Sequence, residues 1–189
     1  MINNALQFTS NILNQFIKNR FGLDESRVLL NNLIDSNGSI PQANQNKIVI
    51  SLINIEKETN KPFYSNQQKV ANGNYVNISL AERYNLDVLI CSNFDDYNET
   101  LKFLTAVITF FQANNSIDAG KYSNIPAGLT KLEYEIEKIT YHNMQSLWTA
   151  MGAKYQPSVV YKMRLITIQA NEAESFSTAI VQTSNLVTL

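Results

Sequence analysis

The sequence has few of the residues on which enzymes, metal sites and disulfide-stabilised folds depend. Its 189 residues include one cysteine, Cys91, one histidine, His142, and one tryptophan, Trp148. A single cysteine excludes a disulfide within the chain, and one cysteine with one histidine cannot form a zinc site unless several carboxylates join them. We therefore expect no metal and no other cofactor, and we expect Cys91 to be a small buried side chain within a strand.

Charge of either sign is also scarce. Only 16% of the residues are charged and the formal net charge is -1, so the chain has no basic field with which to hold nucleic acid. No run approaches the roughly 18 apolar residues of a membrane span. The first five residues also lack the basic start and apolar core of a secretory signal. We expect the protein to be made and folded in the cytoplasm, with neither nucleic acid nor membrane as a partner.

Candidate catalytic residues are few and poorly placed. His142 and Ser146 are i and i+4 neighbours on a predicted helix, but a serine nucleophile needs a strained turn and an oxyanion hole, and a helix supplies neither. The Asn-Gly pairs at 37–38 and 72–73 lack the flanking strand and helix of a phosphate-binding loop. The sequence therefore disfavours an enzyme.

Hydrophobic periodicity predicts a helix near each end of the first 112 residues. The first helix covers residues 3–20, with Asn3 or Asn4 as its N-cap and Gly22 at its C-terminal end. The second begins at a capping box of Asp96 and Glu99 and ends near Gln112. Its expected buried face comprises Tyr97, Leu101, Leu104, Ile108 and Phe111, widened by Phe103, Val107 and Phe110.

Five segments have the composition and alternation of strands. They are residues 28–33, 47–55, 84–91, 129–139 and 158–168. Residues 47–55 are apolar on both alternating faces, which places this strand centrally in the sheet. Residues 59–77 contain few aliphatic side chains and are expected to form a long loop or a projecting arm. The predicted architecture is α+β, a mixed and mostly antiparallel sheet packed with about three helices.

An acidic row is expected on the outer face of the strand at 129–139. Leu132, Tyr134 and Ile136 alternate there with three glutamates, so the apolar residues should face the core and the carboxylates solvent or a partner. Alternating carboxylates on one exposed strand are more simply a solvated or partner-facing row than an acid–base pair. The possible partner-facing residues are Glu133, Glu135 and Glu137.

The only tryptophan lies in a stretch that changes from a helical to a strand pattern. Met144, Leu147, Trp148 and Met151 share one face of a third helix, which Thr140 can cap. A glycine then suits a left-handed helix end, and a proline prevents the helix from continuing. We expect a structural corner whose tryptophan and tyrosines fill the core, without an active site. It consists of Trp148, Gly152, Tyr155, Pro157, Tyr161 and Arg164.

The corner carries a resemblance to a known family. The pattern Trp148-x3-Gly152-x2-Tyr155-x-Pro157-Ser158-Val159-x-Tyr161-x2-Arg164 resembles the end of the N-terminal domain of cap, or tube-terminator, proteins of phage-tail-like contractile injection systems, of the antifeeding-prophage type. The opening residues 1–6, residues 53–58, and the Phe110-Phe111-Gln112 triplet of the second helix are similar to further parts of that domain. Together these segments cover roughly residues 1–168.

The resemblance implies a fold like that of phage tail terminators and a structural function without chemistry. A protein of this family forms a ring, by analogy a hexamer, on the distal end of the inner tube and sheath. It terminates polymerisation there and holds the extended sheath. The implied partners are copies of the chain itself, the tube protein, the sheath protein and a second cap protein for which this chain could serve as an adaptor. The particle can be released from the cell in which it assembles.

The last part of the chain has two interpretations. Residues 1–168 are expected to be the cap domain, and residues 169–189 a β-prone tail that either belongs to the same domain or donates a strand to a partner. The tail residues expected at such an interface are Ile180, Val181, Leu186, Val187 and Leu189.

Two other functions remain open from the sequence. A terminator or connector of an ordinary phage tail would use the same mechanism in a different particle. A small-molecule-binding or enzymatic α+β domain, of a different class, would use a pocket between the sheet and its helices.

Overall fold

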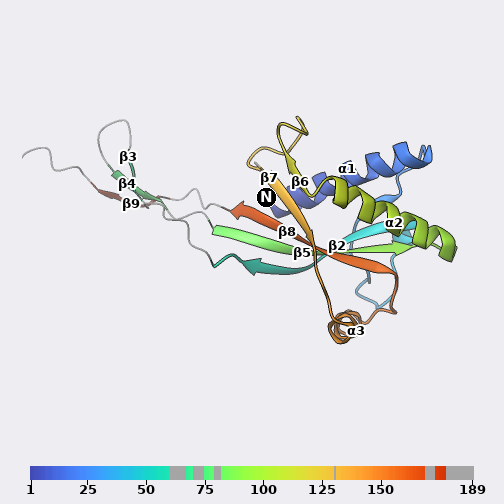
Figure 1. Ribbon diagram of the computed structural model, residues 1–189. Coiled ribbons are helices and arrows are strands. Elements are labelled where there is room, and N and C mark those ends of the chain that lie inside the picture. Colours follow the sequence, from blue (N-terminus) through green and yellow to red (C-terminus); the bar gives the residue numbers. More distant parts are fainter. Residues whose placement is uncertain (60–66, 70–74, 79–81, 130, 169–172, 178–189) are drawn as a thin grey trace, which may run out of the picture.

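A sheet rich in valine, isoleucine and leucine forms the centre of the fold in the computed structural model, which describes residues 1–59, 67–69, 75–78, 82–129, 131–168 and 173–177 (Figure 1). The strands follow the order β1-β2-β5-β8-β7-β6. Among the described strands of this sheet only β1 and β2 pair in parallel, so the sheet is mixed and mostly antiparallel, as predicted. The strands are β1 (Val28–Leu30), β2 (Lys47–Lys57), β5 (Glu82–Asn93), β6 (Ser116–Asp118), β7 (Lys131–Ile136) and β8 (Ser158–Ile168).

The predicted central strand, β2, is interior along only part of its length. Ile48, Val49 and Ile50 are fully buried, which fits their apolar character on both faces. The short β1 pairs only with residues 48–50, and within the described residues no strand lies along that edge of β2 beyond Ile50. The ladder to β5 is interrupted between Leu52 and Asn54. The second half of β2 therefore presents an open sheet edge.

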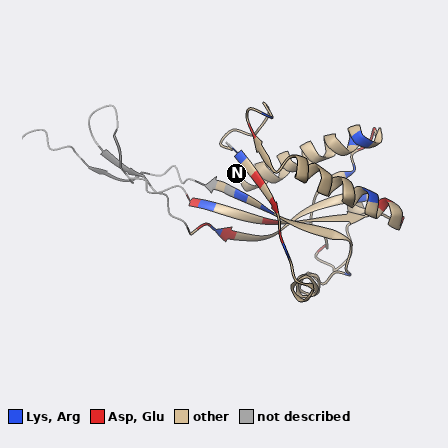
Figure 2. Cartoon of the chain, viewed as in Figure 1, with Lys and Arg blue, Asp and Glu red and all other residues tan. Residues whose placement is uncertain are grey.

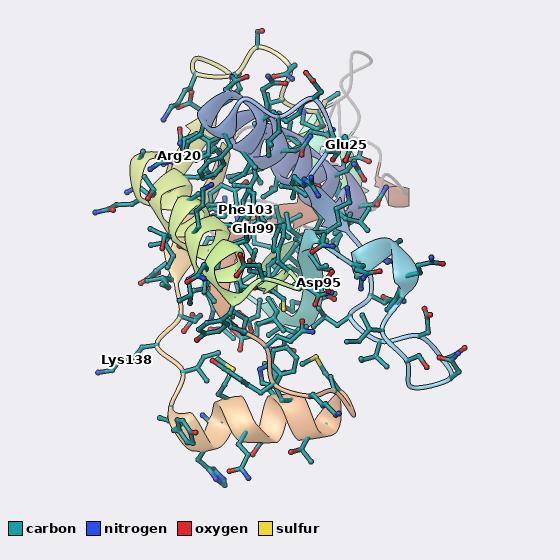
Figure 3. The ribbon with its side chains drawn as sticks, turned by 90° about the vertical axis from the view of Figure 1, so that its right-hand side faces the viewer. Arg20, Glu25, Asp95, Glu99, Phe103 and Lys138 are labelled. Atoms are coloured by element: carbon teal, nitrogen blue, oxygen red, sulfur yellow. The ribbon has the colours of Figure 1, made fainter. Side chains whose placement is uncertain are left out.

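Helices α1 (Ile2–Phe21) and α2 (Tyr97–Ala113) lie side by side on one face of the sheet (Figures 1 and 3). Phenylalanine rings join them, since the centroids of Phe16 and Phe110 are 5.3 Å apart and those of Phe21 and Phe103 are 5.0 Å apart. Beneath the helices lies the larger core, which includes Leu86, Val88, Ile90, Tyr161 and Met163. Burial of this apolar surface is the main stabilising contribution to the fold.

The helix ends agree with the sequence in part. The backbone of Gly22 is left-handed at the end of α1, with φ 63°, and the carboxylate of Asp96 accepts a hydrogen bond of 2.8 Å from the amide of Asn98. The predicted asparagine cap of α1 is wrong, because the helix already begins at Ile2 and includes both asparagines. Met1 is the N-cap, and its side chain makes no capping hydrogen bond.

The buried face of α2 differs from the predicted one. Phe103, Val107, Phe110 and Phe111 are buried, whereas the predicted stripe contains Tyr97 at 63%, Leu101 at 42% and Ile108 at 38% exposure. The reason is that α1 packs against the side of α2 that carries Phe103 and Phe110. This contact turns the Tyr97 stripe away from the core.

Helix α3 (Tyr141–Ala150) lies on the opposite face of the sheet (Figures 1 and 3). It covers a smaller cluster that contains Leu33, Val49, Leu89, Cys91, Trp148 and Val160. Trp148 is the only buried residue of the helix. A short 3-10 helix, η1 (Gln42–Asn44), precedes β2, and Asn44 fixes the neighbouring loop by a hydrogen bond of 2.8 Å from its Nδ2 to the carbonyl of Asn32.

Three further strands form a separate small sheet. They are β3 (Gln67–Lys69), β4 (Tyr75–Ile78) and β9 (Ala173–Ser177), in the order β3-β4-β9, and they lie beyond the ends of β5 and β8 (Figure 1). The described part of residues 59–77 therefore contains strands in a projecting arm, and the alternative prediction of an irregular loop is wrong for them. The first described tail residues, 173–177, pair with β4 within the same chain.

Candidate functional site

Several surfaces of the described residues have the shape or exposure of binding sites. Within them no three histidine, cysteine, aspartate or glutamate side chains converge in a way that could hold a metal ion. A search of the same residues finds no helix with the length and hydropathy needed to cross a membrane. Three surfaces stand out: a groove beside α3, a charged patch on the same face of the sheet, and the exposed stripe of α2.

Both ends of α3 have the caps that the sequence predicts. The hydroxyl of Thr140 accepts a hydrogen bond of 3.3 Å from the amide of Asn143 and so caps the first turn. At the other end Gly152 has φ +67°, and its amide donates to the carbonyl of Thr149 while the amide of Ala153 donates to that of Trp148. This pair of bonds is a Schellman motif, which requires the left-handed residue. The corner therefore directs the chain from α3 into β8.

A groove of about 510 Å³ lies between α3 and the segment that follows its turn. Tyr155 stands on its rim with 66% of its surface exposed, and Tyr141 is 92% exposed. The prediction that Tyr155 fills the core is therefore wrong, although its ring packs edge-on against Trp148 at 5.6 Å. Tyr161 is buried as predicted, but in the core under α1 and α2. The groove is lined by Tyr141, Met144, Gln145, Trp148, Thr149, Ala153 and Tyr155.

Trp148 forms the floor of the corner. Its side chain is 4% exposed and packs with Val49, Leu89 and Val160 of the sheet. Its Nε1–H is buried and has no hydrogen-bond partner among the described residues. A buried donor without an acceptor costs free energy. Trp148 therefore holds α3 on the sheet by its shape and its buried apolar area, and its indole N–H contributes no polar contact.

A second hollow, of about 360 Å³, lies on the other side of α3 between Leu147, Met151 and Leu33.

A charged patch surrounds Lys162 of β8 on the same face of the sheet. Its Nζ lies 2.9 Å from Glu56, 3.1 Å from Glu137 and 3.7 Å from Asp87, and the lysine side chain is only 18% exposed. The hydrogen bond to Glu56 and, to a lesser extent, that to Glu137 raise the pKa of Lys162 against the opposing effect of burial. Figure 2 shows that charges gather on the strands, while the helices are mostly uncharged. Asp87, a charge between the apolar Leu86 and Val88, is the sequence signal that could have located this patch.

The predicted acidic row is not a set of unpaired carboxylates. Glu133 forms an ion pair with Lys131, Glu135 with Arg164 and Glu137 with Lys162. Arg164 thus belongs to the charged patch and not to the corner around Trp148. Leu132 and Tyr134 face the core as predicted, but Ile136 is 55% exposed. The short strand β6 pairs only with residues 131–133 of β7, and Ile136 lies beyond them.

The remaining candidate residues have structural positions. His142 and Ser146 are both exposed on α3, and neither of them lines the groove. Cys91 is buried, and its thiol donates a hydrogen bond of 2.8 Å to the amide oxygen of Gln156. Burial raises the pKa of this thiol to about 12. The predicted tail residues Ile180, Val181, Leu186, Val187 and Leu189 lie outside the described residues.

Comparisons with known proteins agree with this geometry. The family model described as the Pvc16 N-terminal domain matches residues 8–182. The fold is similar to that of the PVC sheath/tube terminator of an extracellular contractile injection system in its extended state, with 13% identity and a TM-score of 0.59. It is also similar to the cap of the anti-feeding prophage, a tube-terminating cap, with 12% identity and a TM-score of 0.55.

The coverage of these structural matches is unequal. Each extends over 94% of this chain but over only 62% and 60% of the respective solved chains, so this chain spans about three fifths of their length. No curated protein matches the sequence. At these identities the likeness establishes the tube-terminator fold, which the resemblance had implied.

Proposed function

Since the chain belongs to the family of Pvc16 N-terminal domains, we propose that it is a structural cap that ends the inner tube and sheath of a contractile injection system. The observation that carries this proposal is a terminator-like fold over 94% of the chain, found in two solved proteins named as a sheath/tube terminator and a tube-terminating cap. The cap binds the distal end of the tube, stops further addition of subunits and holds the extended sheath. It does so by binding alone and without catalysis.

The cap acts as a ring, which we propose to be a hexamer. A tube end presents identical subunits around a rotation axis, and a ring of identical chains matches it subunit for subunit. In this proposal a second cap protein, for which this chain serves as an adaptor, completes the closure. The protein assembles with its particle in the cytoplasm, and the particle can then be released.

A tube-capping assay tests the function. Tubes assembled from the purified tube protein are incubated with this chain, and electron microscopy measures their length distribution and the density at their ends. Capping should produce density at one end only and shorter, more uniform tubes. Density along the tube wall, or a length distribution identical to that of tubes alone, would reject the proposal. Adding sheath protein in a second series separates binding to the tube from binding to the sheath.

The tail is tested separately by truncation after β9. Pairing of β9 with β4 supports the reading in which residues 173–177 complete a sheet of their own chain. Strand donation to the sheath is then a property of residues 178–189. A chain ending at Ser177 keeps β9, so it should still cap tubes but fail to retain sheath if these residues donate a strand. Full sheath retention by the truncated chain would show that the tail makes no such contact.

The two alternative functions differ in what they predict. A terminator of an ordinary phage tail would be isolated with particles that contain a genome. A small-molecule-binding domain needs convergent polar groups in its pocket, whereas the residues that line the α3 groove include no carboxylate, histidine or cysteine. No specific observation on the described residues favours either alternative.

A further inference from the structure

The open half of β2 is an unpaired sheet edge that lies beside an apolar hollow. Strand β1 covers this edge only as far as Ile50, whose carbonyl accepts a hydrogen bond of 3.1 Å from the amide of Asn31. Within the described residues no strand continues along the edge past that point (Figure 1). The backbone groups of successive strand residues point to alternate sides, so the N–H and C=O of Leu52 point to the same open side as those of Ile50.

The edge stays open beyond the bend in β2. The ladder to β5 is interrupted between Leu52 and Asn54, and after this bulge the amide of Glu58 donates to the carbonyl of Arg83 of β5. Counted back from Glu58 by alternation, the N–H and C=O of Ile55 point away from β5. Leu52 and Ile55 therefore each offer one hydrogen-bond donor and one acceptor to an added strand.

The hollow of about 360 Å³ provides a site for one side chain of such a strand. It lies beside residues 51–53 of the open edge, between the segment 32–34 that follows β1 and the end of α3. Its lining is mostly aliphatic, and Leu52, Leu147 and Met151 are only half-buried in it. Addition of a peptide strand to a sheet edge is a recurring mode of binding, in which main-chain hydrogen bonds give affinity and hollows for alternate side chains give specificity.

A net negative charge lies next to the hollow on the same face of the sheet. Glu56, Asp87 and Glu137 share the single ammonium group of Lys162, so one positive charge faces three negative ones. Glu56 belongs to the open strand itself, and its side chain is 47% exposed. The carboxylate nearest to the open edge is therefore accessible to a partner.

The other charged residues of this stretch, among those that the structure describes, leave the imbalance unchanged. Lys57 points to the opposite face from Glu56 and forms an ion pair with Glu82 there. The next charged residues along the two strands, Glu58 and Arg83, are of opposite sign. A cation supplied by a partner is therefore attracted to the position beside Glu56, whereas an acidic partner is repelled.

We propose that the open edge of β2 binds an extended segment of a partner protein that carries an aliphatic side chain and, two residues away, a lysine or arginine. The segment adds as an antiparallel strand, its aliphatic side chain enters the hollow, and its cation lies beside Glu56. One segment reaches both places because side chains two residues apart point to the same face of a strand.

The bend in β2 decides between a segment and a folded partner. It confines the contact to a few residues, which is too small for a stable dimer, since such an interface buries roughly 1,200 Å² or more. The occupant is therefore an extended segment and not a second folded copy of this chain. This site is additional to the capping function and does not depend on it.

Titration of the full chain with a synthetic peptide tests the site. The probe is a capped, threonine-rich peptide that contains Leu-Thr-Arg, because threonine favours an extended conformation. In NMR spectra of the isotope-labelled protein, the amide signals of Leu52 and Ile55 should shift. Replacing the leucine of the peptide by threonine, or its arginine by glutamate, should each weaken binding about tenfold. Absence of these shifts at millimolar peptide, or binding that neither replacement weakens, would overturn the proposal.

Methylation of the peptide backbone separates strand addition from a loose apolar contact. In the antiparallel arrangement the threonines lie opposite Leu52 and Ile55, so their amides face β2 while those of the leucine and arginine face away. Methylating the threonine amides should weaken binding about tenfold or more, and methylating the other two should change it less than about twofold. Equal binding of both methylated peptides would show that no strand is added.

Two variants of the protein test the hollow and the charge. Ala150→Phe fills the hollow from an exposed position of α3 and should weaken binding of the peptide about tenfold. His142→Phe is the matched control, because His142 is exposed on the same helix and lines neither of the two hollows; it should leave binding unchanged. Glu56→Lys should reverse the preference between the arginine and glutamate peptides, and an unchanged preference would refute the basic partner.

Circular dichroism of each variant confirms that it folds. These measurements report peptide binding alone, so their failure would refute the β2 site and leave the capping proposal intact.

Discussion

Replacing Trp148 tests whether a single apolar side chain holds α3 on the sheet. The side chain is 4% exposed, and replacing a buried tryptophan by alanine generally costs about 3–5 kcal/mol. Its Nε1–H is buried without a partner among the described residues, and deleting such a donor recovers about 1–3 kcal/mol. Taking the middle of each range, we therefore expect Trp148→Ala to lower the free energy of unfolding by about 2 kcal/mol.

Trp148→Phe is the matched control, because it keeps most of the ring and removes only the unpaired donor. It should change stability by less than about 1 kcal/mol. Urea denaturation gives both values, provided that the slope against denaturant is unchanged. Hydrogen exchange should show that residues 141–150 lose protection first in the alanine variant, since Trp148 is the only buried residue of α3. A phenylalanine variant as unstable as the alanine variant would refute the reasoning, because it would mean that the indole N–H makes a stabilising hydrogen bond.

Further predictions concern Gly152, Lys162 and Cys91. Gly152→Ala should lower the free energy of unfolding by about 1 kcal/mol, measured by urea denaturation, because the φ of +67° disfavours a side chain even though no atom lies within 4 Å of the added carbon. Lys162→Met should cost about 1–3 kcal/mol by leaving three carboxylates without their cation, whereas the exposed Lys131→Met should cost about 0–1 kcal/mol. The pKa of Lys162 is raised above 10.5 in the folded state. Its contribution to the free energy of unfolding should therefore be constant from neutral pH to about pH 10 and decline only as the pH rises further through the folded-state pKa. A contribution already lost at pH 9 would contradict this. Cys91 should react with a thiol reagent at the rate of unfolding rather than at the rate of an exposed thiol, because it is buried and its pKa is about 12; rapid labelling of the native protein would contradict its burial.

The elements of the fold follow from local patterns, which is why most of them could be predicted. Gly152 and Pro157 define the corner through backbone geometry that no distant contact can alter. The strand at 84–91 has one apolar face under α1 and α2 and another under α3, so its composition alone identifies it as interior. The same is true of the buried half of β2.

The surfaces depend on contacts that the sequence does not specify. Either side of α2 could have been buried, since Leu101 and Phe103 are both apolar, and the position of α1 decides between them. The glutamates of β7 appear as a bare acidic row until the register of β8 places Lys162 and Arg164 opposite them. Tyr155 is exposed because its segment lies on the rim of a groove. Each of these features requires knowledge of which strands and helices are neighbours in space.

The open edge of β2 has a consequence for the solubility of the free protein. Past Ile50 this strand has backbone groups that no described strand covers, and such an edge can template the addition of identical chains into insoluble fibres. The interruption between Leu52 and Asn54 bends the edge, and Glu56 and Lys57 place charges along it. An added strand would have to accommodate the bend and bury or displace those charges. The bend and the charges thereby oppose the addition of identical chains along this edge.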